Sequence, residues 1–243
     1  MFKFSKIVSA VALAVAGVAA NAGVIIDDFE VPAAGPKIEA SGGGSNAVTQ
    51  ASGTILGGSR DLFIQATGPS GLVAGVQVAG GILSVSNDSL ISSQTIVRWD
   101  GTASGVGDSV DVDGLLGVTI PGVGADLTDG AIGIQLNVID ADKPFSITLD
   151  VWSDVANNGV YVLQSLTKNL VAGVNYGATF LFTDLVGANF ADVGAIQFTI
   201  NSTASFDLSV DLVQAVPEPG SLALAGLALA GLGMARRRKV AAK

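Results

Sequence analysis

Carboxylates beside aromatic side chains are the residues of this chain best suited to bind a ligand. Trp152 lies two residues from Asp150 and two from Asp154, so alternation along a β-strand places all three on one face. Asn158–Gly159 is a turn signal that folds Tyr161 back onto that face. An aromatic ring can stack on a sugar ring while carboxylates accept hydrogen bonds from its hydroxyl groups. These four residues form a candidate sugar site, unless a second layer covers the face and makes Trp152 part of the core.

The residue types on which most enzymes depend are missing. The 243 residues include no His and no Cys. A Ser-His-Asp triad, a thiolate nucleophile and a zinc finger are therefore excluded. What remains is carboxylate chemistry, a Ser–Lys pair or a metal held by oxygen. We therefore expect a protein that is not an enzyme, and a carboxylate-dependent glycan hydrolase or lyase is the alternative.

A second group of acidic residues has the spacing of a metal-binding loop. Asp111 and Asp113 alternate and are followed by Gly114, as at the start of a calcium loop. The position at which an EF-hand carries its bidentate Glu is Ile120, so this segment is not an EF-hand. An ordinary Asp-rich turn is the alternative.

Acidic and basic residues are unevenly distributed between the middle of the chain and its ends. Residues 23–216 hold 20 acidic and 5 basic residues, a net charge of −15, whereas both ends are basic. An acidic surface repels the phosphates of nucleic acid, which we therefore exclude as a partner. Divalent cations and neutral polymers are better partners for such a surface.

The segments that must position these side chains are β-strands. Apolar residues alternate with polar ones, and Gly, Asn, Asp and Pro interrupt the pattern. Helical periodicity is suggested only near 185–193, and residues 32–36 and 41–45 are expected to form a flexible loop. Ten antiparallel strands predict an all-β sandwich, with a β-solenoid as the alternative although no repeat supports it. The predicted strands are 24–29, 61–66, 82–86, 95–99, 131–139, 145–151, 160–166, 178–183, 195–200 and 206–212.

The hairpin around the candidate sugar site has a predicted register. A two-residue turn at Asn158–Gly159 pairs Trp152 with Ser165 across the two strands. Trp99 is adjacent to apolar Val97, and we expect it in the core.

The N-terminal 22 residues read as a cleaved secretory signal helix. Two lysines precede an apolar run over 7–20, and Ala20 and Ala22 stand before Gly23 with the small side chains that signal peptidase requires. The run is too short for a membrane anchor, which is the alternative.

The C-terminal segment has three parts in a fixed order. Pro217, Glu218 and Pro219 come first, an apolar helix over 221–234 follows, and a basic cluster at 236–239 ends the segment. The helix is at or below the thickness of a bilayer, which favours a temporary anchor in the inner membrane with the arginines in the cytoplasm. The expected organisation is a signal peptide at 1–22, a β-sandwich domain at 23–215 and a sorting signal at 216–243.

This three-part tail resembles the PEP-CTERM sorting signal of Gram-negative bacteria. The resemblance implies cleavage by a membrane exosortase, a bacterium that makes exopolysaccharide, and delivery to the cell surface or the extracellular matrix. It implies nothing about the chemistry of the domain that precedes the tail.

The first and last expected strands resemble those of galactose-binding-like jelly rolls, a fold of many carbohydrate-binding modules. The residues that carry this resemblance are 26–30, 193–198 and 210–212. In that family the terminal strands lie together and often hold a structural calcium ion, which here implies Asp28 and Glu30 with Asp207 or Asp211.

The function we expect is that of a non-catalytic surface or matrix protein associated with exopolysaccharide. The alternatives are the hydrolase or lyase named above and a purely structural adhesin.

Overall fold

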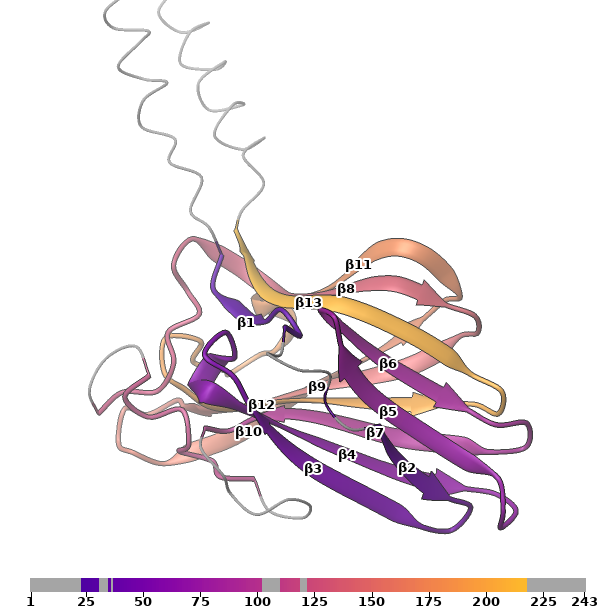
Figure 1. Cartoon of the computed structure of the whole chain (residues 1–243). Coiled ribbons are helices and arrows are strands. Elements are labelled where there is room, and N and C mark those ends of the chain that lie inside the picture. The colour runs from indigo at the N-terminus through magenta and orange to yellow at the C-terminus, as the bar shows by residue number, and fades with distance from the viewer. Residues whose placement is uncertain (1–22, 31–34, 36, 102–109, 119–121, 218–243) are drawn as a thin grey trace, which may run out of the picture. The chain divides into compact units, whose positions relative to one another are not determined.

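Thirteen strands in the described residues form two antiparallel sheets that face each other (Figure 1). The computed structural model describes residues 23–30, 35, 37–101, 110–118 and 122–217, and the expected signal helix and C-terminal helix lie outside these ranges. Residues 23–216 make one compact unit. The strands are β1 (Ile25–Asp27), β2 (Ile38–Ser41), β3 (Ser45–Ala51), β4 (Ser59–Thr67), β5 (Val73–Ala79), β6 (Ile82–Asn87), β7 (Ser92–Trp99), β8 (Ala131–Ala141), β9 (Phe145–Asp154), β10 (Tyr161–Leu170), β11 (Gly173–Leu181), β12 (Val193–Ser202) and β13 (Asp207–Pro217).

The chain alternates regularly between the two sheets. The seven-stranded sheet has the order β11-β8-β13-β6-β5-β2, with β1 added on β13, and the six-stranded sheet has the order β10-β9-β12-β7-β4-β3. Short turns of two to five residues connect β2 to β3, β4 to β5, β6 to β7, β8 to β9, β10 to β11 and β12 to β13, and each of them crosses between the sheets. The long connections between β7 and β8 and between β11 and β12 are therefore at the opposite end of the sandwich. This loop-rich end adjoins the candidate site.

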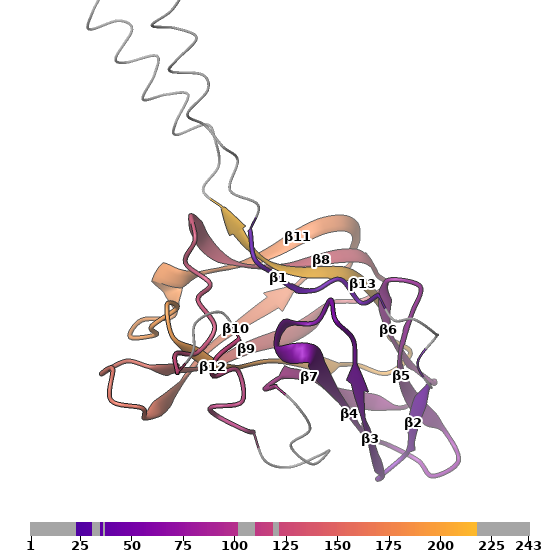
Figure 2. The same cartoon turned by 60° about the vertical axis from the view of Figure 1, so that its left-hand side comes forward.

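The all-β sandwich expected from the alternating pattern is confirmed, with three strands added. The segment 41–45, expected to be a flexible loop, contributes to β2 and β3, and only residues 42–44 form the turn between them. No α-helix occurs in the described part of the chain, so the helical reading near 185–193 is wrong. The only helical turn near it is the 3-10 segment Phe182–Asp184. The terminal strands lie side by side, because β1 pairs with the C-terminal half of β13 (Figure 2).

The core between the sheets is made by the inward positions of nearly every strand. Alternation is strict in β9, where Ile147, Leu149 and Val151 are fully buried and their neighbours face outward. Trp99 is fully buried as expected, and its ring meets Phe198 edge to face with centroids 6.0 Å apart. Aromatic pairs in this geometry add stability beyond the area that they bury.

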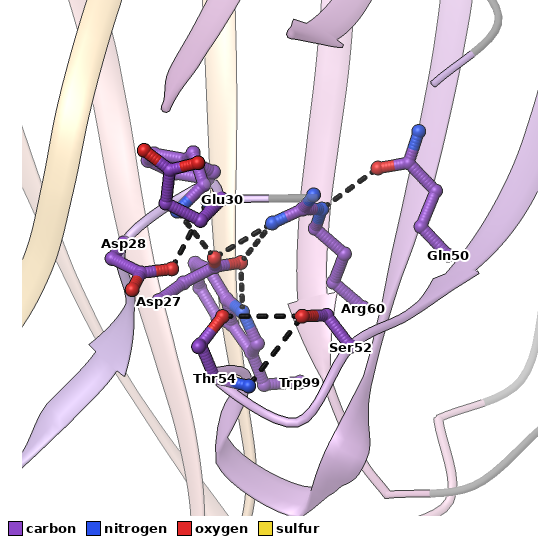
Figure 3. A network of polar contacts seen from close by, with 9 residues as sticks. Asp27, Asp28, Glu30, Gln50, Ser52, Thr54, Arg60 and Trp99 are labelled. Atoms are coloured by element: carbon purple, nitrogen blue, oxygen red, sulfur yellow. Dashed lines mark hydrogen bonds and ion pairs between the residues drawn. The ribbon is translucent and has the colours of Figure 1, made fainter. Parts of the chain in front are cut away.

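A buried ion pair crosses this core (Figure 3). Asp27, at the end of β1, receives hydrogen bonds from Arg60 Nη1 at 2.6 and 2.8 Å and from the Trp99 indole N–H at 2.9 Å. The backbone N–H of Phe29 also donates to this carboxylate at 2.8 Å. β1 belongs to the seven-stranded sheet, whereas Arg60 and Trp99 belong to the six-stranded sheet. The pair therefore ties the first strand to the opposite sheet.

The guanidinium group of Arg60 has further partners in the core. Arg60 Nε donates to Gln50 Oε1 at 2.8 Å, and its guanidinium carbon lies 5.4 Å from the centre of the Phe29 ring. Charges buried this deeply are tolerated only when they are paired and hydrogen-bonded. The network thereby specifies how the N-terminal segment docks on the domain.

Candidate functional site

The hairpin of β9 and β10 carries the four predicted sugar-site residues on one face. Strand register pairs Asp154 with Tyr161 and Trp152 with Leu163, and directly opposed residues share a face. Alternation places Asp150, Trp152 and Asp154 on the outer face of the six-stranded sheet, opposite the buried Ile147, Leu149 and Val151. Trp152 is half-buried there and does not belong to the core.

The predicted two-residue turn is wrong, although the grouping of side chains does not depend on it. The connection between β9 and β10 is a six-residue loop over 155–160, and Trp152 therefore pairs with Leu163 and not with Ser165. A register shift of two residues keeps each side chain on its face.

Asp154 explains why the loop is wider than the Asn-Gly pair suggests. Its carboxylate accepts hydrogen bonds from the N–H of Asn158 at 3.1 Å and the N–H of Gly159 at 2.6 Å. Burial raises the pKa of Asp154, but these N–H groups outweigh it and hold the pKa below its ordinary value of 3.8. The carboxylate thus stabilises the loop while it borders the site.

A row of polar side chains crosses the outer face of the six-stranded sheet from one edge to the other. Cross-strand register aligns one residue from each strand, in the order Ser165, Asp150, Gln197, Arg98, Asp61 and Thr49. Asp150 accepts from the Ser165 hydroxyl and, at 3.2 Å, from Gln197 Nε2. Gln197 Oε1 in turn accepts from Arg98 Nε at 2.9 Å. This chain of hydrogen bonds holds the Asp150 carboxylate in place next to Trp152.

The far half of the row contains an acceptor that is not satisfied. Asp61 accepts from the Thr49 hydroxyl at 2.5 Å, but its second carboxylate oxygen is buried and has no hydrogen-bond partner in the described structure. Burial raises the pKa of Asp61, and the charge of Asp100 raises it further. This oxygen is buried on β4, three strands from Trp152.

A hollow of about 780 Å³ opens beside Tyr161 at the loop-rich end of the sheet. Its lining comes from four segments of the chain. These lining residues are Leu116, Gly122, Val123, Asp154, Val155, Asn157, Gly159, Tyr161, Asn189, Ala191 and Asp192. The Tyr161 hydroxyl donates to Asp192 Oδ1 at 2.9 Å, and the same oxygen accepts from the N–H of Gly124 at 2.7 Å. Trp152 and the hollow are thus adjacent, since Tyr161 is next to Trp152 on the same face.

The segment 110–118 packs against this end of the face. Leu115 N–H donates to the carbonyl of Gly194 at 3.0 Å, and Asp111 N–H donates to Asp100 Oδ2 at 3.0 Å. A Cβ atom at Gly194 would lie 2.0 Å from the carbonyl oxygen of Val112 and 2.6 Å from the Tyr161 ring. Glycine at this position lets the segment approach the sheet and brings its carboxylates toward Tyr161.

Carboxylates around Tyr161 disfavour the ionised form of its hydroxyl. Burial, the hydrogen bond to Asp192 and the charges of Asp192, Asp154 and Asp113 raise the pKa of Tyr161 to about 12. Hydrogen bonding to Asp113, with burial, likewise raises the pKa of Asp111. The electrostatic potential at the site is therefore negative.

The four residues implied as calcium ligands are dispersed over several environments. Asp28 and Glu30 follow β1, where Glu30 N–H donates to Asp28 Oδ1 at 3.0 Å. Asp207 begins β13 and donates its N–H to Asp142 Oδ1, whereas Asp211 borders a hollow of about 250 Å³ over β8 and β11. The described residues contain no group of three or more Asp, Glu, His or Cys side chains that could hold a metal ion. Calcium binding stays a prediction, and thermal melts in calcium, in magnesium and in chelator would test it.

The residues of the two predicted processing sites lie at the limits of the described chain. Gly23 and Pro217 are described, and Ala20, Ala22, Glu218 and Pro219 lie outside. The N–H of Ala215 donates to the carbonyl of Val24 at 2.8 Å, so the two processing sites start from neighbouring strands. Among the described residues there is no helix long and apolar enough to span a membrane.

Asp61, Arg98, Asp192 and Gln197 were not among the predicted site residues. Asp61, Arg98 and Gln197 belong to strands distant in sequence from the hairpin, and only the sheet order places them on the same face. Asp192 lies in the connection between β11 and β12. The available signal was a polar residue at an outward position of an otherwise apolar strand, as with Gln197 between Ile196 and Phe198.

The similarity to solved structures is to carbohydrate-binding and phage proteins. The Family 11 carbohydrate-binding module of the cellulosomal cellulase Lic26A-Cel5E of Clostridium thermocellum is 13% identical, with a TM-score of 0.38 over 82% of this chain and 96% of that chain. A Family 11 module from Clostridium thermocellum in complex with a β-1,3-1,4-mixed-linked tetrasaccharide is 13% identical, with a TM-score of 0.35 over 79% and 94%. The enzymatically active domain of tailspike protein 4 of bacteriophage CBA120 is 11% identical, with a TM-score of 0.34 over 63% and 19%. No curated protein matches the chain.

The tail, in contrast, matches a family model. Residues 215–239 match the PEP-CTERM protein-sorting motif and include all three parts of the tail described above. The chain therefore carries the PEP-CTERM sorting signal of secreted proteins.

Proposed function

We propose that this chain is an exported protein that binds polysaccharide without catalysing a reaction on it. The observation that carries the proposal is the position of Trp152, half-buried on the outer face of a sheet with Asp150 fixed beside it. A flat aromatic surface with a fixed hydrogen-bond acceptor at its edge matches a sugar ring, which has an apolar face and a rim of hydroxyl groups.

The neighbouring hollow extends the surface on which a ligand would lie. Tyr161 and Asp192 offer an aromatic ring and a carboxylate there. The polar row does not extend this surface beyond Asp150, because Gln197, Arg98 and Asp61 are buried. Such a surface suits an extended chain of sugars better than a single small molecule.

The destination that we propose is the cell surface or the exopolysaccharide matrix. Signal peptidase would release the domain at Gly23, and an exosortase would remove the tail near 216–220 after a transient stay in the inner membrane. The sorting motif at 215–239 supports this route. Intact mass measured on protein from the native host should lack residues 236–239, and a product that retains them contradicts the processing step.

Binding is tested by affinity electrophoresis of the full chain against a panel of soluble polysaccharides. The Trp152→Ala variant should lose the retardation of the unmodified chain, because the stacking surface is removed. Phe63→Ala is the matched control, since Phe63 is also a half-buried ring on the outer face of this sheet but lies on β4, three strands from β9. Retardation unaffected by Trp152→Ala contradicts the proposed site, and release of reducing sugar would favour a hydrolase instead.

A further inference from the structure

Carboxylates surround the aromatic surface of the candidate site. Asp150 and Asp154 alternate with Trp152 on β9, and Asp192 accepts the hydrogen bond of Tyr161. The charge of Asp113 also acts on Tyr161 from segment 110–118. A ligand on the two rings therefore lies within a ring of negative charge.

The hydrogen bonds to these carboxylates come from neutral donors. Asp150 accepts hydrogen bonds from a hydroxyl and a side-chain amide, and Asp154 accepts them from two backbone N–H groups. Asp192 accepts hydrogen bonds from a hydroxyl and a backbone N–H. Neutral donors orient a carboxylate but leave its charge uncompensated. The negative potential at the rings is thus preserved, in agreement with the raised pKa of Tyr161.

The basic residues of the same sheet lie elsewhere or serve the sheet itself. Lys168 is on the inner face of β10, where its ammonium group donates to the carbonyl of Thr179 at 2.6 Å and lies 3.9 Å from Asp184. Arg98 lies within the polar row and gives its Nε hydrogen to Gln197. Arg60, the third basic residue of this sheet, is buried in its pair with Asp27. None of the three borders the hollow at Tyr161.

This distribution of charge discriminates between classes of polysaccharide. Uronic acid or sulfate groups would bring further negative charge against Asp113, Asp154 and Asp192, and like charges at short range repel each other. Ammonium groups would have the opposite effect.

We propose that the ligand of this site is a polysaccharide with free amino groups, such as a partly deacetylated amino-sugar polymer. This inference rests on the proposed function, because it names the class of glycan that the Trp152 face binds. The Trp152 and Tyr161 rings stack on the sugar, and the carboxylates favour residues whose amino group carries a positive charge.

The test compares two oligosaccharides of equal length that differ only in the acetylation of their amino groups, which removes the positive charge. The full chain is kept in a non-ionic detergent without sugar groups, and its binding to chitosan oligosaccharide is compared with binding to the N-acetylated oligosaccharide of equal length by isothermal titration calorimetry. The deacetylated ligand should bind roughly tenfold more tightly at about 20 mM salt, and the difference should shrink toward about 500 mM salt. An oligogalacturonate should bind more weakly than either.

Two double variants separate a local effect from attraction to an acidic domain. Asp113→Asn with Asp192→Asn removes two charges at the site and should abolish most of the preference, since Asn retains the oxygen that holds Tyr161. Glu39→Gln with Asp140→Asn removes two charges from exposed residues of the other sheet and should leave the preference unchanged.

Each outcome decides a separate point. Absence of binding to every glycan overturns the proposed function and this inference with it. Equal binding of the acetylated and deacetylated ligands, both lost in Trp152→Ala, leaves the proposed function standing and overturns the inference. An equal loss of preference in the two double variants also overturns it, because the attraction would then be nonspecific.

Discussion

Asp27 is the side chain on which the docking of the first strand depends. It is fully buried and holds hydrogen bonds from Arg60, from the indole of Trp99 and from the Phe29 N–H. Asp27→Asn leaves the Arg60 charge buried without its counterion, so the free energy of unfolding should fall by about 3–5 kcal/mol. Urea denaturation followed by tryptophan fluorescence measures this change.

The adjacent residue provides the control. Asp28 is half-buried, and its carboxylate accepts a hydrogen bond from the Glu30 N–H. Asp28→Asn should therefore change the free energy of unfolding by less than about 1 kcal/mol. If both variants lost the same amount, the ion pair would not be the cause.

Asp154 makes stability depend on pH in a defined direction. Its pKa lies below 3.8 in the folded domain, so the unfolded chain binds more protons near that pH and stability rises as pH increases. Its contribution is complete above about pH 3.8 and is lost as pH falls through the folded-state value. Thermal melts should therefore show that Asp154→Ala destabilises the chain at pH 7, with a penalty that disappears in acid. A penalty independent of pH would mean that the carboxylate charge has no role in holding the loop.

Strands with strict alternation could be predicted from the sequence, and strands made of small residues could not. In β9 large apolar residues stand at every second position and are buried, so burial and pattern agree. β12 has the same sequence pattern, but all of residues 193–198 are buried, and in β13 the buried positions change phase between Val210 and Val213. β5 (Val73–Ala79) alternates as β9 does, with Ala74, Val76 and Val78 inward, but Gly75 and its small neighbours weaken the signal. The glycines at 42–44 look like a loop and are a turn between β2 and β3.

The candidate site was predictable only within a single hairpin. Asp150, Trp152, Asp154 and Tyr161 share a face because of local alternation, whichever loop joins the strands. Asp61, Arg98 and Gln197 join them through the order of strands in the sheet, which depends on pairing between distant segments. Local sequence contains no information on such pairings.

β10 is an edge strand with an inward-facing charge. Lys168 pairs with the buried Ile147 and therefore points between the sheets, where its ammonium group lies 5.3 Å from the Phe180 ring. Inward charges on edge strands oppose pairing with another sheet, because pairing would desolvate them. Lys168→Leu should therefore increase self-association, measured by sedimentation velocity over a range of concentrations.

Thr167→Leu is the matched control, since it adds the same side chain to the outer face of β10 and keeps the lysine. Equal association of the two variants would attribute the effect to added apolar surface alone.

At the scale of the whole domain, the first and last described strands pair in one sheet. β1 and β13 pair through Ile25 with Gln214 and Asp27 with Val213, and β13 continues to Pro217. The sorting motif begins at residue 215, so the folded domain and the motif overlap by three described residues. Cleavage beyond Pro217 leaves every pairing of β1 intact.

Truncation tests how close to the domain this cleavage can occur. A chain that ends at Pro217 should melt at the temperature of the longer chain's sandwich. A chain that ends at Leu212 loses the fully buried Val213 and Ala215 and frees β1, so its free energy of unfolding should be lower by more than about 2 kcal/mol. Differential scanning calorimetry compares the three chains. Equal stability of the two truncated chains would show that β1 docks through its core contacts, the buried Ile26 and the Asp27–Arg60 ion pair, and not through its pairing with β13.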